Sequence, residues 1–366
     1  MEHPENDDLY KGLKVNKGVA NVPTVNPYLT KRLQRKEYTP AEFVEGILQG
    51  NITILSQAVT LVESAKYEHQ QVAQEVIEKC LPYSGKSVRV GITGVPGAGK
   101  STSIDAFGTY MIEQGHKLAV LAIDPSSERS KGSILGDKTR MEELSREKNA
   151  FIRPSPSAGS LGGVARKTRE TIVLCEAAGF DTIFVETVGV GQSETAVHSM
   201  VDFFLLIQLA GTGDELQGIK RGIMEMADGI IINKADGDNI NKAKLAANQF
   251  RNALHLFPTP ESGWTPQVLT YSGYYKLGIK EIWKMIDEYI TFTKNNGCFA
   301  AKRNDQSKYW MYESINETLR ETFYHNPAVI SKLKTAEQQV LNNEISSFIA
   351  AKQMMDLFLK EISGKK

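Results

Sequence analysis

The sequence has few of the residues that build metal centres and disulfide frameworks. Its 366 residues include three cysteines and six scattered histidines. Cys80, Cys175 and Cys298 are far apart and odd in number, so they match neither a metal-ligand spacing nor a disulfide framework. This cysteine usage favours a reducing compartment, and we expect a cytoplasmic location.

An excess of one charge sign is also missing. Lys and Arg together number 43, as do Asp and Glu, so the formal net charge is zero and no global field attracts nucleic acid or an anionic membrane. No apolar run approaches the roughly 20 residues that cross a bilayer. The acidic first eight residues lack the apolar core of a secretory signal. We therefore expect no nucleic-acid partner and no membrane partner.

A glycine-rich loop follows the apolar run 88–93. It fits the pattern Gly, four residues, Gly-Lys-Ser/Thr, in the strand, loop and helix context of a phosphate-binding loop. Its backbone N–H groups and the start of the next helix favour phosphate oxygens. Lys100 is expected on the β and γ phosphates, as a catalytic residue, and Ser101 on Mg²⁺. The predicted nucleotide-binding residues here are Gly94, Val95, Pro96, Gly97, Ala98, Gly99, Lys100, Ser101 and Thr102.

Short apolar runs alternate with helical segments from about residue 87, which is typical of a parallel α/β sheet. The predicted strands are Val88–Thr93, Leu118–Ile123, Thr182–Val185, Phe203–Leu209, Gly229–Ile232 and Gln267–Thr270. In such sheets ligands bind at the carboxyl ends of the strands. The fold class expected is α/β, a P-loop NTPase G domain with a mostly parallel sheet, flanked by N-terminal helices and a C-terminal helical dimerisation arm.

Acidic residues follow two of these runs. Asp124 ends the second run and is favoured as a Mg²⁺-linked carboxylate over a turn cap, and Asp137, in the charged loop after it, is a second metal-shell candidate. Glu186 ends the third run, with Gly189 three residues on, as in loops that sense the γ-phosphate. Switch GTPases usually have Asp where this chain has Glu186. Gln192 either positions the attacking water or is a solvated loop amide.

The fifth run ends in Asn233-Lys234-Ala235-Asp236, which indicates guanine. The carboxylate of Asp236 can accept from both the ring N–H and the amine of guanine, and adenine offers no such donor pair. Lys234 is expected along the base face. Ser272 and Gly273, after the sixth run, are expected to complete the base pocket through backbone N–H groups.

The fourth run leads into a loop with four glycines, 211–222, that is either a two-state switch or a polar connector. Its candidate signalling residues are Asp214, Glu215, Gln217 and Lys220, with Arg140 from the earlier charged loop. Arg140 and Lys220 are also the candidates for a charge-stabilising finger in hydrolysis.

Helical patterns flank this nucleotide-binding region. Thr39 and Pro40 predict a helix start, a second helix is expected from about Ile52 to Cys80, and a closing helix from about Ile279 to Lys294. We expect two further helices after residue 296, whose apolar faces pack either on a second copy, giving a homodimer, or on their own domain. The predicted domains are 1–85, an N-terminal arm and helical segment; 86–295, the GTPase domain; and 296–366, the dimerisation segment.

Beyond the phosphate loop, several strings carry a resemblance. They are Ser133 to Met141, Arg153-Pro154-Ser155-Pro156, Glu186 to Glu194 and Asp214 to Gly222. With these strings the chain resembles the MeaB/ArgK/MMAA family of P-loop GTPases, chaperones of adenosylcobalamin-dependent methylmalonyl-CoA mutase. Residues 128–131 are more charged than is usual in that family, and Ser272-Gly273 replaces a more usual Ser-Ala.

The resemblance implies GTP as substrate, GDP as product, and Mg²⁺ near Ser101, Asp124, Asp137 and Glu186. It also implies a third switch at 214–222 that signals to the mutase, and a homodimer through the C-terminal helices. The expected function is a Mg²⁺-dependent GTPase that gates cofactor loading and protects or reactivates that mutase or a related acyl-CoA mutase. Two alternatives are a metal-inserting metallochaperone GTPase and a nucleotide-regulated scaffold with negligible hydrolysis of its own.

Overall fold

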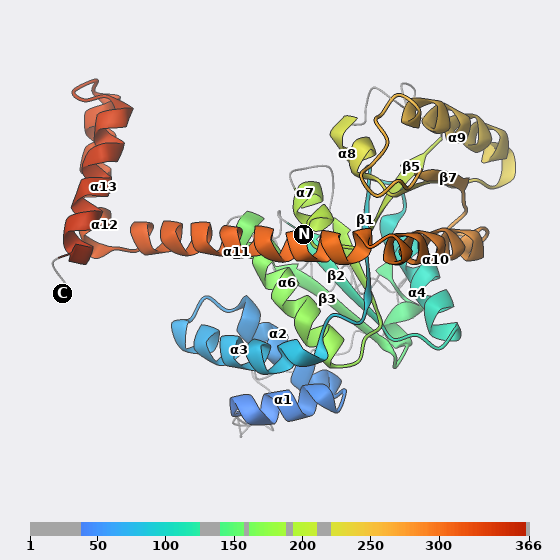
Figure 1. The fold of residues 1–366 in the computed structure, drawn as a ribbon, viewed down its shortest axis with the longest axis horizontal. Helices are drawn as coiled ribbons and strands as arrows, with labels where there is room; N and C mark the ends of the chain where they lie inside the picture. Colours follow the sequence, from blue (N-terminus) through green and yellow to red (C-terminus); the bar gives the residue numbers. More distant parts are fainter. Residues whose placement is uncertain (1–37, 125–139, 157–160, 188–192, 211–220, 364–366) are drawn as a thin grey trace, which may run out of the picture. The chain divides into compact units, whose positions relative to one another are not determined.

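A seven-stranded, wholly parallel sheet forms the centre of the molecule. The computed structural model describes residues 38–124, 140–156, 161–187, 193–210 and 221–363. Within them the strands lie in the order β3-β2-β4-β1-β5-β6-β7, and every neighbouring pair is parallel. The strands, shown in Figure 1, are β1 (Val88–Gly94), β2 (Leu118–Asp124), β3 (Ala150–Pro156), β4 (Thr182–Thr187), β5 (Phe203–Leu209), β6 (Gly229–Asn233) and β7 (Gln267–Thr270).

Helices precede, connect and follow these strands. Before the sheet come α1 (Pro40–Leu48), α2 (Ile52–Glu63) and α3 (Tyr67–Cys80). Those between and just after the strands are α4 (Lys100–Glu113), α6 (Leu161–Ala177), α7 (Ser193–His198), α8 (Arg221–Met226), α9 (Ile240–Leu254) and α10 (Ile279–Asn295). The chain continues in α11 (Cys298–Tyr324), α12 (Pro327–Leu341) and α13 (Ser347–Ser363).

The structure confirms the predicted α/β class and corrects three details. All six predicted strands are present, but a seventh, β3, was missed. The predicted helix from Ile52 to Cys80 is two helices, because the chain is extended at Ser64 and Lys66. The tail has three helices where two were predicted: Asn326 caps the start of α12 ahead of Pro327. The predicted domain boundaries stay predictions, since contacts within 39–366 form one unit.

Alternate residues of β1 face opposite sides of the sheet. Val90 and Ile92 belong to a buried cluster with α4 and α10, whose members there include Phe107 and Ile286. Gly91 faces the other side, where a Cβ would lie 2.9 Å from a methyl group of Val197 in α7. The close approach of α7 to β1 therefore requires glycine at this position.

Helix α11 is fastened to the segment that joins α7 to β5. The Arg303 guanidinium donates to both carboxylate oxygens of Asp202, at 2.8 and 2.7 Å. The side-chain amide of Gln306 donates to the Val201 carbonyl at 2.8 Å, and the indole of Trp310 to the Ser199 carbonyl at 3.0 Å. The first half of α11 thus packs on the sheet domain through hydrogen bonds to three residues between 199 and 202.

Two further observations concern helix length and the cysteines. No helix in the described ranges is long and apolar enough to cross a membrane. Cys80, Cys175 and Cys298 are free thiols, and burial raises the pKa of Cys80 to about 11.

Candidate nucleotide site

The glycine-rich loop joins β1 to α4 at the carboxyl edge of the sheet. Helix α4 begins at Lys100, and Gly99 before it has φ +83°, in the left-handed region that favours glycine. A Cβ on Gly99 would lie 2.7 Å from the side-chain nitrogen of Asn233. The backbone here is therefore shaped as a phosphate loop requires, and Ser101 and Thr102 occupy the first turn of α4.

The Lys100 side chain folds back over the loop. Its ammonium donates to the carbonyl oxygen of Gly94 at 2.9 Å and to that of Val95 at 3.4 Å. Burial lowers the pKa of Lys100, and the negative charges of Glu186 and Glu194 oppose that shift. The only cation of the phosphate loop thus lies in the field of two carboxylates.

Glu186 lies in β4 beside β1 and is only 5% exposed. Its strand pairs with β1 so that Ile92 is opposite Glu186, and the hydroxyl of Thr187 donates to that of Thr93 at 2.9 Å. A buried carboxylate at the carboxyl edge and the Ser101 hydroxyl provide oxygen donors, the type that Mg²⁺ prefers. These residues fit the metal that the sequence predicts.

Asn233 links the phosphate loop to the base side of the site. This side chain is 3% exposed and donates to the Ala98 carbonyl at 2.7 Å. Its side-chain oxygen accepts from the backbone N–H groups of Lys234 at 2.7 Å and Gly273 at 3.0 Å. The side-chain oxygen and one N–H of this amide therefore hold together the phosphate loop, the loop after β6 and the loop after β7.

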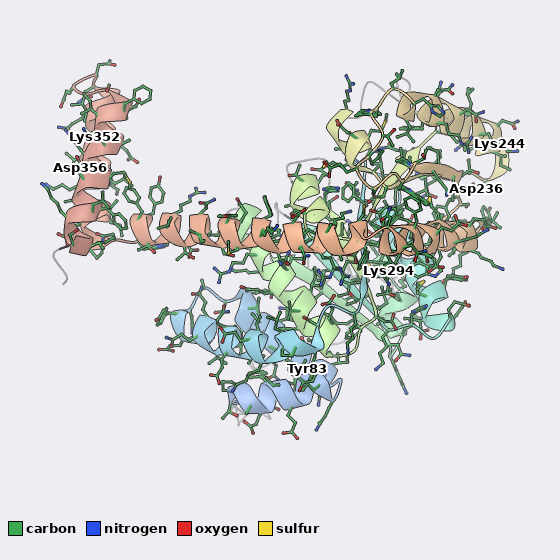
Figure 2. All side chains as sticks on the ribbon, in the orientation of Figure 1. Tyr83, Asp236, Lys244, Lys294, Lys352 and Asp356 are labelled. Carbon is green, nitrogen blue, oxygen red and sulfur yellow. The ribbon has the colours of Figure 1, made fainter. Side chains whose placement is uncertain are left out.

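Asp236 follows at the end of the same loop (Figure 2). The Ser272 hydroxyl donates to its carboxylate at 2.5 Å, and Lys234 before it has φ +59°. The backbone N–H groups of Ser272 and Gly273, predicted to face the base, donate instead to Leu277 and Asn233 in this structure. Their part in the base pocket stays a prediction.

Several predicted site residues lie outside the described ranges. This holds for Asp137, Gly189, Gln192, Asp214, Glu215, Gln217 and Lys220. The backbone of Asp124 ends β2 at the expected edge, but its side chain is not described. Arg140 is described and exposed. The metal and switch assignments at these positions remain predictions.

Two features of the site were not expected from the sequence. Asn233 was assigned to the nucleotide, and its structural role as a bridge was missed. Glu194, only 2% exposed, was given no role at all. The sequence does contain a hint of a role for Glu194. It is a charged residue in a short helical segment, and the residues next to it there are small or apolar.

The metal-inserting alternative would be supported by a cluster of metal-ligating side chains. In the ranges that the structure describes, no three His, Cys, Asp or Glu side chains lie together as a metal site. The structure therefore adds nothing in favour of the metal-inserting alternative.

The amino-acid sequence was compared with known protein families, and the family that matches is one of nucleotide-binding proteins. The family described as Methylmalonyl Co-A mutase-associated GTPase MeaB matches residues 55–328, which is well over half of the chain. The chain belongs to the MeaB family of GTPases. GTP hydrolysis is accordingly its reaction, and the resemblance read from the motifs is confirmed.

Individual relatives cover nearly all of their own length. The chain is 45% identical over 320 residues to the GTPase ArgK of Escherichia coli, covering 87% of this chain and 97% of the relative. It is 46% identical over 330 residues to the mouse mitochondrial methylmalonic aciduria type A homolog, covering 87% and 79%. A crystal structure titled LAO/AO transport system kinase superposes with a TM-score of 0.70 at 39% identity, covering 88% and 99%.

Proposed function

We propose that this MeaB-family GTPase is a chaperone of an adenosylcobalamin-dependent methylmalonyl-CoA mutase or a related acyl-CoA mutase. In this role GTP hydrolysis gates the loading of intact adenosylcobalamin and the rejection of damaged cofactor. One observation carries the proposal: the family match runs from 55 to 328, so it includes the nucleotide site and α11 together. The description of the family names methylmalonyl-CoA mutase, and the mouse relative is named after methylmalonic aciduria.

The hydrolytic step is direct attack of water on the γ-phosphate of GTP. Lys100 has to leave the carbonyls of Gly94 and Val95 to reach the β and γ phosphates. Asp236 accepts the two donors of guanine, and Asn233 keeps the base loop in register with the phosphate loop.

Mg²⁺, when bound, supplies charge neutralisation between the phosphates. Ser101 and Glu186 would hold it with Asp124 and Asp137, and Gln192 is the candidate that orients water. No residue is assigned as an arginine finger, for which Arg140 and Lys220 remain candidates.

The C-terminal helices support a homodimer. Helices α12 and α13 pack on each other and, with the end of α11, enclose an apolar groove of about 790 Å³. Exposed apolar side chains line it, among them Leu319, Leu341 and Met355. Exposed apolar area of this kind is typical of a protein interface.

A transfer assay tests the chaperone role. The full chain is loaded with GTP or with a non-hydrolysable analogue and mixed with apo-mutase and adenosylcobalamin, and cofactor bound to the mutase is measured by its absorbance. We expect gating that requires hydrolysis: with GTP, intact cofactor is loaded and cob(II)alamin is refused, and with the analogue this discrimination is lost. Equal loading of both cofactors under all nucleotide conditions would reject the chaperone role.

A further inference from the structure

Glu194 is a buried carboxylate beside the phosphate loop that has no assigned task. It lies in the first turn of α7, directly after the loop 188–192, and is 2% exposed. A carboxylate leaves water at a high cost in free energy unless cations or donors compensate its charge. The groups that surround Glu194 therefore determine what its charge can do.

The packing of α7 shows which way this carboxylate faces. Val197 lies on Gly91 in the middle of β1, and α7 leads into β5, whose Phe203 pairs with Val90 near the start of β1. Helix α7 therefore runs from the carboxyl edge of the sheet toward the amino edge. Glu194 precedes Val197 by three residues, so it shares that face of the helix and lies about one turn, roughly 5 Å, nearer the carboxyl edge.

That position is the end of β1, where the chain turns into the phosphate loop. Thr93 and Thr187 join the ends of β1 and β4 there by a 2.9 Å hydrogen bond between their hydroxyls. The ammonium of Lys100 is held above the same turn by the Gly94 carbonyl. Burial lowers the pKa of Lys100, and the negative charges of Glu186 and, to a smaller extent, of Glu194 oppose that shift, which is consistent with both carboxylates lying near the ammonium.

We propose that Glu194 is a positioning residue for GTP hydrolysis, which orients the ammonium of Lys100 at the mouth of the phosphate loop. Glu186, in β4, is the carboxylate expected to bind Mg²⁺, so the two buried carboxylates have different roles. The inference rests on GTP hydrolysis by this chain and not on the mutase role, so either can fail without the other.

The test is the steady-state kinetics of Glu194→Gln in the full chain. Glutamine keeps the size of the side chain and removes its charge. We expect kcat to fall about 10–100-fold, the range seen when the residue that supports a working group is lost. KM for GTP is expected to stay equal or fall, because a negative charge near an anionic substrate is removed.

A merely structural role predicts a different pattern, in which KM rises and the midpoint of urea unfolding drops. Glu194→Asp, which keeps the charge on a shorter side chain, should recover part of the lost kcat. The matched control is Glu170→Gln in α6, where the carboxylate pairs with Arg166 at 2.9 Å and belongs to no part of the nucleotide site. Its kcat and KM are expected to match those of the unmodified chain.

Two outcomes overturn the proposal: a kcat of Glu194→Gln within twofold of the unmodified chain, or a loss of kcat matched by an equal rise in KM. If Glu194→Gln does not fold, Glu194→Ala, which also removes the charge, takes its place. A kcat of that variant within twofold of the unmodified chain then rejects the orienting role.

Discussion

Asn233 and Asp236, the two residues predicted at the base, lie in different surroundings. The side-chain amide of buried Asn233 donates to the Ala98 carbonyl and accepts from two backbone N–H groups. Asn233 therefore holds the loops together. Asp236 is partly exposed and accepts from Ser272, so its carboxylate is the group available to a base. Specificity for guanine is therefore expected to depend on Asp236, and the shape of the site on Asn233.

Asp236→Asn tests this division. An amide no longer accepts from both guanine donors, so we expect the affinity for GTP to fall about 10–100-fold. Xanthosine triphosphate, which carries an oxygen acceptor in place of the guanine amine, should gain affinity. Titration of both nucleotides measures the change, and Asp238→Asn, an exposed neighbour, is the control. An unchanged preference for GTP over xanthosine triphosphate would contradict the assignment.

His198, at the end of α7, makes stability depend on pH. Burial lowers its pKa to about 4, with Lys302 adding to the shift and Asp228 opposing it. The unfolded residue has a pKa near 6.5. Between these values the unfolded chain binds a proton that the folded chain does not, so this contribution is complete above pH 6.5 and is lost as the pH falls.

Urea unfolding at pH 7 and pH 5 measures this effect. The unmodified chain should lose about 1–2 kcal/mol more than His198→Gln over that interval. An equal loss in the two proteins would show that His198 does not titrate as its burial requires.

The site was predictable where a motif fixes the chemistry and not where tertiary packing does. The phosphate loop at 94–101 and the tetrapeptide at 233–236 have spacings that only a few kinds of site require. The burial of Glu194 depends on how closely α7 approaches Gly91, which no local pattern encodes. Similarly, the bridge made by Asn233 depends on β1 and β6 ending at the same edge of the sheet.

At the scale of elements, helix α11 is anchored in part by the ion pair of Arg303 with Asp202. Asp202 is 2% exposed and accepts from Arg303 and from the backbone N–H of Arg89 at 2.8 Å. Because the carboxylate joins α11 to the start of β1 and β5, its loss leaves a partly buried guanidinium without its main partner.

Asp202→Ala is therefore expected to lower the free energy of unfolding by about 3–5 kcal/mol, as for other broken buried pairs. Asp305→Ala, which removes an exposed pair with Lys308 on the same helix, should change it by less than about 1 kcal/mol. Urea titrations of the two variants make the comparison. Equal effects would contradict the anchoring of α11 by Asp202.

The missed and misjudged elements have physical explanations. Strand β3 contains Pro154 and Pro156, which argue against a strand, and it is tolerated because it lies at the edge of the sheet. The break between α2 and α3 at Ser64 has no glycine or proline to mark it. The six other strands were predicted because strands covered on both faces are short apolar runs.

At the scale of the whole molecule, α11, α12 and α13 form a groove that is lined by exposed apolar side chains. We propose that a second copy covers it. Met355→Asp places a charge among the apolar side chains that line the groove, so it should convert a dimer to a monomer.

Light scattering on a sizing column measures the mass. Lys352→Asp, on the same helix but not among the lining residues, is the control and should remain dimeric (Figure 2). A monomer in the unmodified chain, or a dimer in both variants, would contradict the proposed interface.

We propose that the GTP cycle of this chain serves a cobalamin-dependent mutase. Phosphate release from GTP, measured for the chain alone and with a methylmalonyl-CoA mutase from the same cell, tests it most directly. We expect hydrolysis by the chain to rise severalfold when the mutase is present, and to be lost with Lys100→Ala in either condition. A rate that the mutase leaves unchanged, or a Lys100→Ala variant that hydrolyses GTP normally, would contradict the account.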